Sequence, residues 1–203
     1  MKNKNTVAKV FIFLAGLTIL ALGINLMTTC ASLGLSPWDS LFIALREKFG
    51  FTIGIWIFAV NVAMTAIVYY QDKNDVTLGT IAMIVLISVF VDGIGYLAMD
   101  YLKQVPDVIA FVMGNLAIGA GIGLYVSTHL MIAPHESFMM MLTKRFNWSY
   151  RKADIIASIG AVFVSLSLSG PIFVGTIVLT FTTGFIIQFV MEFSRKHLIQ
   201  MES

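Results

Sequence analysis

Long stretches of apolar residues, separated by short polar segments, dominate the chain. Each stretch has roughly 20 residues, the length that an α-helix needs to cross the hydrocarbon core of a bilayer. The pattern predicts six transmembrane helices, at 9–31, 53–71, 77–99, 107–130, 152–170 and 172–193. We therefore expect an all-α polytopic membrane protein.

Two shorter apolar segments follow the first and the fourth predicted spans. They run from Pro37 to Phe49 and from Pro134 to Phe146, 13 residues each. Both are too short to cross a bilayer and too apolar for ordinary loops. Segments of this kind form re-entrant or interfacial helices, and the sequence leaves the choice between the two open.

The composition indicates one membrane domain over 1–203, without a separate soluble part. Hydrophobic residues make up 58% of the chain and charged residues 12%, whereas about a quarter of a soluble domain is charged. The lipid bilayer is therefore the expected partner. The formal net charge of +2 gives no reason to expect nucleic acid, and the pattern indicates no oligomeric state.

No catalytic or metal-binding motif stands out. Cys30 is the single cysteine, which excludes an intramolecular disulfide and a cysteine metal cluster. The histidines His129, His135 and His197 do not form the HExxH spacing of a zinc protease. The glycines of 93–95 lie within a predicted span, so they do not form a dinucleotide-binding loop. We expect neither an enzyme nor a bound cofactor or metal.

Basic residues are distributed unevenly between the two sides of the predicted helices. With the N-terminus inside, ten Lys and Arg residues lie inside and three, Arg46, Lys48 and Lys103, lie outside. Cytoplasmic loops carry the excess of Lys and Arg, so both termini are predicted to be cytoplasmic. The first apolar run, from Val10 to about Met27, is longer than the core of a signal peptide, so we interpret it as an uncleaved span.

The two short segments begin with the same phrase. Ser36-Pro37-Trp38-Asp39-Ser40 and Ala133-Pro134-His135-Glu136-Ser137 lie 97 positions apart. Gly79-Thr80-Ile81 in the third span matches Gly175-Thr176-Ile177 in the sixth, 96 positions further on. Two signatures in the same order indicate a repeat, with halves at 1–103 and 104–203. Because each half has three spans, the second half enters the membrane from the opposite side, which makes an inverted-topology repeat.

The first half also resembles a bacterial family. The stretch LGLSPWDSLFIALREKFGFTIG, followed by LGTI in the third span, is similar to the YczE/YyaS/YitT-type integral membrane proteins. The residues that carry the resemblance are Gly34, Pro37, Trp38, Asp39, Gly54, Gly79 and Thr80. The resemblance implies a multi-pass protein of the bacterial cell (inner) membrane and says little about activity.

The acids in the two phrases have a structural interpretation. Pro favours the first helical position, and Ser36 with Asp39 fits a capping box. Glu136 keeps the same offset from Pro134, although Ala133 is a poor cap. Acids near a helix N-terminus also stabilise the helix dipole. Under this interpretation, Asp39 and Glu136 are helix stabilisers only.

A functional interpretation adds a second pair of polar residues. Asp92 lies within the third predicted span, and its repeat equivalent in the sixth is Gln188. On this interpretation Asp39 and Asp92 meet on the outer side of the membrane. His135, Glu136 and Gln188 meet on the inner side. The two clusters would form two vestibules or gates, with a substrate or an ion as the ligand.

Asp92 is the strongest of these candidates, because a carboxylate inside a span is costly unless it is paired, hydrated or protonated. If it serves function alone, neutralising Asp92 should leave the folded yield normal and if anything stabilise the fold. The structural alternative is an ion pair of Asp92 with Arg46 or Lys48 at the outer interface.

Other polar residues lie within the spans. Asn61 and Ser158 are repeat equivalents and therefore further binding candidates. For Asn25, Asn115 and Thr180, hydrogen bonds between helices are the expected role.

Small residues at helix starts and helix faces have structural explanations. Thr80 and Thr176 each follow a Gly at the start of a span, where we expect them to cap a helix or kink the backbone. Small residues over Ala117 to Gly123 predict close helix packing in the fourth span.

Three functions fit these observations. The first is a small-molecule or ion transporter or channel built on the inverted repeat, with an unknown substrate. The second is a non-transporting membrane accessory or assembly protein. The third is the substrate-binding membrane subunit of a vitamin-type uptake system, which would bind a coupling protein through small-residue helix faces. Acidic clusters without a mid-membrane Lys or Arg favour a cationic or neutral substrate over an anion.

Overall fold

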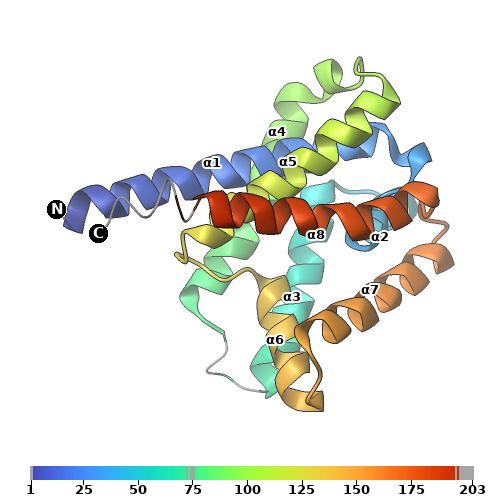
Figure 1. Cartoon of the computed structure of the whole chain (residues 1–203). Coiled ribbons are helices and arrows are strands. Elements are labelled where there is room, and N and C mark those ends of the chain that lie inside the picture. Colours follow the sequence, from blue (N-terminus) through green and yellow to red (C-terminus); the bar gives the residue numbers. More distant parts are fainter. Residues whose placement is uncertain (1, 72, 74–75, 195, 197–203) are drawn as a thin grey trace.

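The computed structural model describes residues 2–71, 73, 76–194 and 196 and is helical throughout (Figure 1). The helices are α1 (Lys2–Thr29), the short 3-10 helix η1 (Ala31–Leu33), α2 (Pro37–Phe49), α3 (Ile53–Gln71), α4 (Leu78–Leu102), α5 (Asp107–Ser127), α6 (Pro134–Phe146), α7 (Tyr150–Ser167) and α8 (Val174–Ser194). The predicted all-α architecture is confirmed. His197 lies outside the described residues.

Five of these helices, α1, α3, α4, α5 and α8, are long and apolar enough to cross a membrane. The predicted fifth span, 152–170, corresponds to α7, which is not among the five. Helix α7 has 18 residues, and its first two turns carry Arg151, Lys152 and Asp154. These charges leave only a short apolar stretch, so a sixth span stays a prediction.

The centre of the fold is a close crossing of α1 and α5. Glycines line both sides of this crossing, and a Cβ added at Gly121 would lie 2.5 Å from the backbone nitrogen of Leu20. On the opposite side of α5, a Cβ at Gly123 would lie 2.9 Å from the carbonyl oxygen of Ile187 in α8. The predicted packing role of the small residues of α5 is therefore confirmed.

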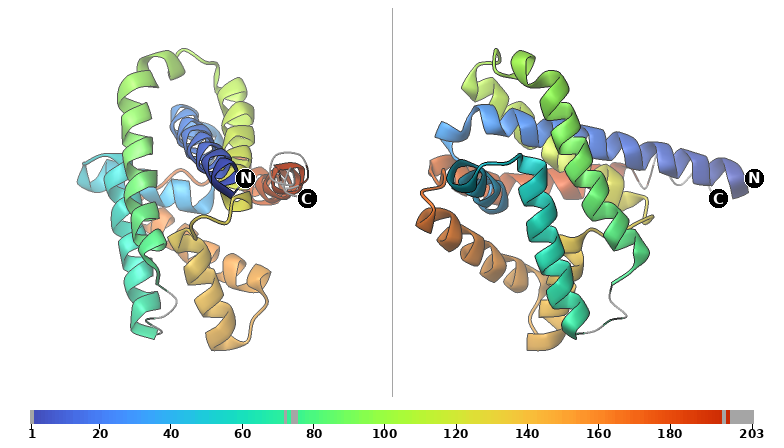
Figure 2. Two further views of the ribbon diagram at one scale, coloured as in Figure 1. Left: turned by 90° about the vertical axis from the view of Figure 1, so that its left-hand side faces the viewer. Right: turned by 180° about the vertical axis from the view of Figure 1, so that it is seen from behind.

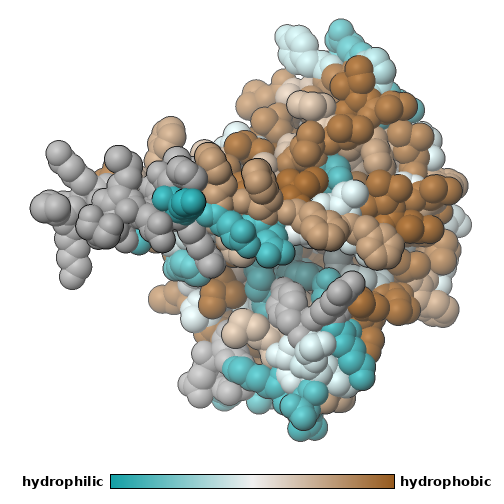
Figure 3. Space-filling model, viewed as in Figure 1, coloured by the Kyte–Doolittle hydropathy of each residue, from teal (hydrophilic) through white to brown (hydrophobic). Residues whose placement is uncertain are grey.

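The remaining helices pack around this centre. Viewed along its axis, α1 lies between α4 and α5, with α8 beyond α5 (Figure 2). Helix α3 packs along α4, α2 packs against α7, and α6 packs against α3. The side of the molecule in Figure 3 is largely hydrophobic over α5 and α8, as expected for a surface that faces lipid.

Polar side chains within the spans join some of these helices. The Asn25 amide donates to the carbonyl oxygen of Val91 over 2.8 Å and connects α1 to α4. Asn115 exchanges hydrogen bonds of 2.8 and 2.7 Å with Thr182 and Thr183 and connects α5 to α8. The expected interhelical role of Asn25 and Asn115 is confirmed.

Other polar side chains stay within their own helix. Asn61 donates to the carbonyl oxygen of Ile57, four residues before it, over 2.9 Å. Thr180 likewise donates to the carbonyl oxygen of Thr176 over 2.7 Å. For Thr180 the expected hydrogen bond between helices is therefore replaced by one to its own backbone.

Threonines act at the starts of α4 and α8. The Thr77 hydroxyl accepts from the Thr80 backbone N–H and caps α4, and the hydroxyls of Thr77 and Thr80 are also hydrogen-bonded to each other over 3.1 Å. The Thr176 hydroxyl accepts from the Phe173 backbone N–H over 3.3 Å. Thr176 thus has the expected contact at a helix start, whereas the cap of α4 is Thr77 and not the predicted Thr80.

Candidate functional site

The two short helices have the bounds that the sequence predicts, 37–49 and 134–146. Ser36 is the N-cap of α2, and its hydroxyl accepts from the Asp39 backbone N–H over 3.2 Å. Ala133 gives α6 no such side-chain cap. Both helices end in left-handed backbone, at Gly50 with φ 77° and at Asn147 with φ 52°. Gly and Asn are the residues that tolerate this conformation, so the local sequence accounts for both ends.

The first turns of these two helices meet inside the molecule. The rings of Trp38 and His135 are in edge-to-face contact, with centroids 5.4 Å apart and an interplanar angle of 82°. Trp38 and His135 occupy the second position of each helix, so the contact joins corresponding points of the two phrases. We refer to Trp38, Asp39, His135 and Glu136 as the central cluster.

Asp39 lies where α2 faces α1. The Ser36 hydroxyl also donates to its carboxylate over 2.6 Å, so the predicted pairing of Ser36 with Asp39 forms, with the second bond from the Ser36 side chain instead of its backbone N–H. Burial raises the pKa of Asp39, and the hydrogen bond from Ser36 opposes that rise. The carboxylate is thus held by its own helix turn.

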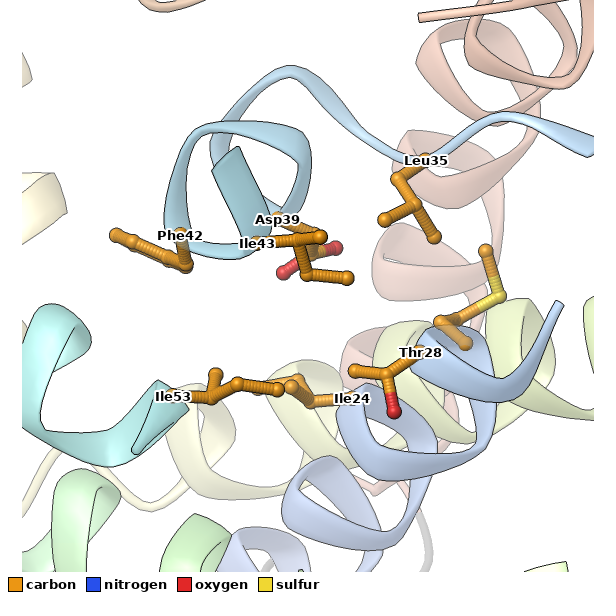
Figure 4. Close-up of a pocket in the computed structure, with 8 residues that line it drawn as sticks. Ile24, Thr28, Leu35, Asp39, Phe42, Ile43 and Ile53 are labelled. Atoms are coloured by element: carbon orange, nitrogen blue, oxygen red, sulfur yellow. The ribbon is translucent and has the colours of Figure 1, made fainter. Parts of the chain in front are cut away.

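The surroundings of Asp39 are tightly packed. Asp39, Phe42 and Ile43 of α2 lie across a narrow crevice from Ile24 and Thr28 of α1 (Figure 4). The crevice has no space for a water molecule. In this conformation, water cannot reach Asp39 from this crevice.

Glu136 occupies the equivalent position in α6 but has different partners. One carboxylate oxygen, Oε1, accepts from the Tyr125 hydroxyl of α5 over 3.1 Å. The other, Oε2, is shielded from solvent and has no hydrogen-bond partner among the described residues. Burial raises the pKa of Glu136, and the hydrogen bond from Tyr125 and the nearby backbone N–H groups of Glu136 and Ala133 oppose the rise. An unsatisfied oxygen on a shielded carboxyl group is a place for a proton or a bound donor.

His135 adds a titratable group to the cluster. Its Nε2 lies 3.6 Å from Oδ1 of Asp154 in α7, too far for a hydrogen bond. Burial lowers the pKa of His135, while the negative charge of Asp154 raises it. The indole Nε1 of Trp38 is also shielded and without a hydrogen-bond partner in the described structure. The central cluster therefore has several polar atoms that the protein itself leaves unsatisfied.

Asp92 lies apart from the central cluster and binds the start of α3. Its carboxylate accepts from the Thr52 hydroxyl over 2.5 Å and from the Gly54 backbone N–H over 2.8 Å. The Thr52 hydroxyl in turn accepts from the Ile55 N–H over 3.2 Å. Asp92 thus satisfies one free N–H group of another helix, that of Gly54, and accepts from the hydroxyl that caps a second one, a role that its position within a span did not reveal.

The two predicted meetings of polar residues do not occur as expected. Ile53 borders the crevice that holds Asp39, and the next residue, Gly54, binds Asp92, so the first turn of α3 separates the two acids. Gln188 donates to Glu192 of its own helix over 2.9 Å instead of meeting Glu136. Within the described residues, no hydrogen bond or ion pair joins Asp39 to Asp92 or Gln188 to Glu136.

The other proposed partners of these residues also differ from expectation. No ion pair joins Asp92 to Arg46 or Lys48 in the part of the chain that the structure describes. Asn61 lies on α3 and Ser158 on α7, and among the described residues no hydrogen bond joins either of them to the central cluster. In the same part, no group of three or more His, Cys, Asp or Glu is placed to hold a metal ion.

Sequence reasoning missed the partners Tyr125, Thr28, Thr52 and Asp154. One signal was available, because Thr28 and Tyr125 lie 97 positions apart, as Asp39 and Glu136 do. Only Tyr125 bonds its acid, however, since Thr28 lines the crevice opposite Asp39 but donates to the carbonyl oxygen of Asn25 over 2.7 Å. The contacts of Thr52 and Asp154 depend on tertiary placement alone.

A bundle of apolar helices, with two short helices meeting inside it, defines a multi-pass helical membrane protein. The chain belongs to the family of unknown function DUF6198, which it matches over residues 7–192. It is 31% identical to the "Uncharacterized membrane protein YczE" of Bacillus subtilis, over 93% of this chain and 87% of that one. The resemblance to YczE and YyaS found in the sequence is confirmed.

Two further relatives are more distant. The "Uncharacterized protein YyaS" of Bacillus subtilis is 28% identical, with 91% of this chain and 92% of that one covered. An "Uncharacterized protein" of Haemophilus influenzae is 26% identical, with 89% of this chain and 82% of that one covered. No solved structure matches the chain. The name of YczE supports a membrane protein, and none of the three names assigns an activity.

Proposed function

We propose that this protein is a non-enzymatic transporter or channel of the bacterial inner membrane, built as two inverted three-helix repeats with both termini cytoplasmic. The observation that carries the proposal is the central cluster, in which two short helices begin inside the molecule with unsatisfied polar atoms. Transporters commonly place such discontinuous helices at the interface of their repeats, where the substrate binds.

Corresponding residues support the inverted repeat. Thr52 accepts from the Ile55 N–H at the start of α3, and Ser149, 97 positions later, caps α7 by accepting from the Lys152 N–H. The left-handed ends at Gly50 and Asn147 keep the same offset. These features lie outside the matching motifs at 36–40 and 133–137, so they support the repeat independently of those motifs.

Helix packing follows the same correspondence. Helices α1 and α5 cross at the centre, and each packs against the last long helix of its own half, α4 or α8. Helix α2 packs against α7, and its counterpart α6 packs against α3. The exception is the contact of α3 with α4, since no comparable packing joins α7 to α8 within the described residues. Two halves in different conformations are what alternating access between two states requires.

The chemistry of the cluster favours a proton, a cation or a neutral substrate. Two helix N-termini alone would favour an anion. However, Asp39 and Glu136 lie in the first turns of these helices and offset that field. The free oxygen of Glu136 accepts a hydrogen bond or binds a proton, and it does not attract an anion.

Transport is tested with purified protein in liposomes that contain a pH-sensitive dye. Glu136→Gln should abolish or strongly reduce proton-linked flux, because Gln cannot exchange a proton at neutral pH. The matched control is Glu192→Gln, since Glu192 is an exposed acid outside the cluster. Equal flux through Glu136→Gln and wild type, with a similar folded yield, would refute the role of the cluster.

A second candidate function is a non-transporting accessory protein, which the dry crevice beside Asp39 favours. If neither wild type nor any cluster variant moves protons or ions across the liposome membrane, this second function is preferred. The vitamin-uptake subunit is less well supported. The small residues Gly121 and Gly123 that would bind a coupling protein are already in contact with α1 and α8.

A further inference from the structure

A groove of about 540 Å³ lies between α3 and α4, apart from the central cluster. Its α3 side consists of Gly54, Ile55 and Phe58. Its α4 side carries two valines, Val85 and Val89, before it reaches the polar end. Since α3 and α4 are both candidate membrane spans, the groove opens toward the lipid.

The apolar walls of the groove are partly exposed in the isolated chain. Ile55 is 45% exposed, Phe58 43% and Val89 60%. Figure 2 shows α3 and α4 side by side on the outside of the molecule, with no other helix over them. The segment from Val85 to Gly93 is about 12 Å long at 1.5 Å per residue, enough for a substantial part of an acyl chain.

One end of the groove is polar and negatively charged. Asp92 lies there beside Ser88 and Gly93. Both hydrogen bonds to its carboxylate come from neutral donors, Thr52 and Gly54, so the negative charge stays uncompensated. Each carboxylate oxygen has more than one lone pair, so each can accept a further hydrogen bond. No basic side chain lines the groove.

The position of Asp92 fits the level of a lipid headgroup. Helix α3 has 19 residues and is about 28 Å long, so its first turn lies near the membrane boundary. Asp92 binds that first turn, whereas Phe58 lies about one turn deeper. The acid is thus at the headgroup end, and the apolar walls are at the acyl-chain end.

We propose that this groove binds a bilayer lipid with a primary-amine headgroup. The ammonium group would donate hydrogen bonds to Asp92, and one acyl chain would lie along Val85, Val89 and Phe58. A quaternary ammonium headgroup fits less well, because it has no N–H to donate and is recognised by aromatic faces. No aromatic residue lies at the Asp92 end among the lining residues. An anionic headgroup would be repelled.

Lipid retention tests the proposal. The full chain is purified from detergent micelles supplied with equal amounts of phosphatidylethanolamine, phosphatidylcholine and phosphatidylglycerol, and the retained lipids are counted by mass spectrometry. Wild type should retain phosphatidylethanolamine about tenfold over phosphatidylcholine, as expected for a charge-assisted hydrogen bond. Asp92→Asn should remove most of this preference.

A second variant changes the volume of the groove and leaves its charge unaltered. Gly93 lines the groove and a Cβ there meets no atom within 4 Å, so Gly93→Leu adds apolar volume at the groove wall without a backbone clash at the Cβ. It should reduce the amount of retained phosphatidylethanolamine. The matched control is Gly184→Leu on α8, where a Cβ also meets nothing, and it should retain lipid as wild type does.

Two results would overturn the proposal. The first is equal retention of phosphatidylethanolamine and phosphatidylcholine by wild type. The second is a preference that Gly93→Leu leaves unchanged. Glu136→Gln should retain lipid normally, so loss of transport in that variant does not affect this inference.

Discussion

Replacing Asp92 should destabilise the protein, although the charge lies within a membrane span. The carboxylate accepts from the Thr52 hydroxyl and from the Gly54 backbone N–H. Both donors belong to the start of α3, where helical N–H groups have no partner of their own. Capping therefore offsets the desolvation cost of the charge. We expect replacement of Asp92 to lower the stability of the fold, whereas replacement of a purely functional acid would raise it.

The structure sets the size of the effect. A lost N-cap costs about 0.5–2 kcal/mol, and a hydrogen bond to a charged group is worth about 1.5–3 kcal/mol. Asp92 is only half-buried, so we take the lower end of these ranges. Asp92→Ala, which removes both acceptors, should cost about 2 kcal/mol. Asp92→Asn keeps one acceptor for Gly54 and should cost about 1 kcal/mol.

Thermal unfolding in detergent gives the ranking, with Asp100→Asn as the control on the same helix, since Asp100 is exposed. The expected order of stability is wild type and Asp100→Asn, then Asp92→Asn, then Asp92→Ala. Thr52→Val should cost less once Asp92 is Ala than it does in wild type, because the hydrogen bond that the two residues share is already lost. The cost that remains is the lost cap on the Ile55 N–H. An Asp92→Asn protein as stable as wild type, or more so, would show that capping does not outweigh the cost of the charge.

Three other outcomes follow from the structure. Gly121→Leu should reduce the folded yield sharply, because a Cβ there lies 2.5 Å from the Leu20 backbone, whereas Gly160→Leu, with open space, should fold normally. External thiol reagents should label a Cys at Lys103 and not one at Lys73, with the buried Cys30 giving little background; the reverse would refute the orientation. Ala133→Ser should stabilise the fold by about 0.5–1 kcal/mol by capping α6, measured as a rise in the unfolding temperature.

Local signals in the sequence predicted the short helices well. Pro37 and Pro134 mark their first residues, and Gly50 and Asn147 follow their last. Each of these signals depends on the backbone within about one helical turn, so no tertiary information is needed. The capping box of Ser36 and Asp39 was predictable for the same reason.

Contacts between helices were not predictable in this way. Lipid-facing and protein-facing sides of a membrane helix are both apolar, so the sequence does not fix the rotation of the helix about its axis. Asp92 binds residues 38 and 40 positions away, and Gln188 turns to Glu192 instead of Glu136. The small residues of α5 were the exception. They predict close helix packing whichever helix is the partner, because two helix backbones approach closely only where side chains are small.

The difference between Asp39 and Glu136 follows from one residue in the preceding loop. Ser36 donates to Asp39 over 2.6 Å and satisfies it within its own helix. Ala133 holds the equivalent place before α6 and has no hydroxyl; Oε1 of Glu136 accepts from Tyr125 instead, and Oε2 has no hydrogen-bond partner among the described residues. In Ala133→Ser, the new hydroxyl would donate to the Glu136 carboxylate, as the Ser36 hydroxyl does to Asp39. If Oε2 of Glu136 binds the transported proton or substrate, the Ala133→Ser variant should be more stable than wild type and should also show less proton-linked flux. If Ala133→Ser only caps α6, its stability should rise and its flux should stay as in wild type.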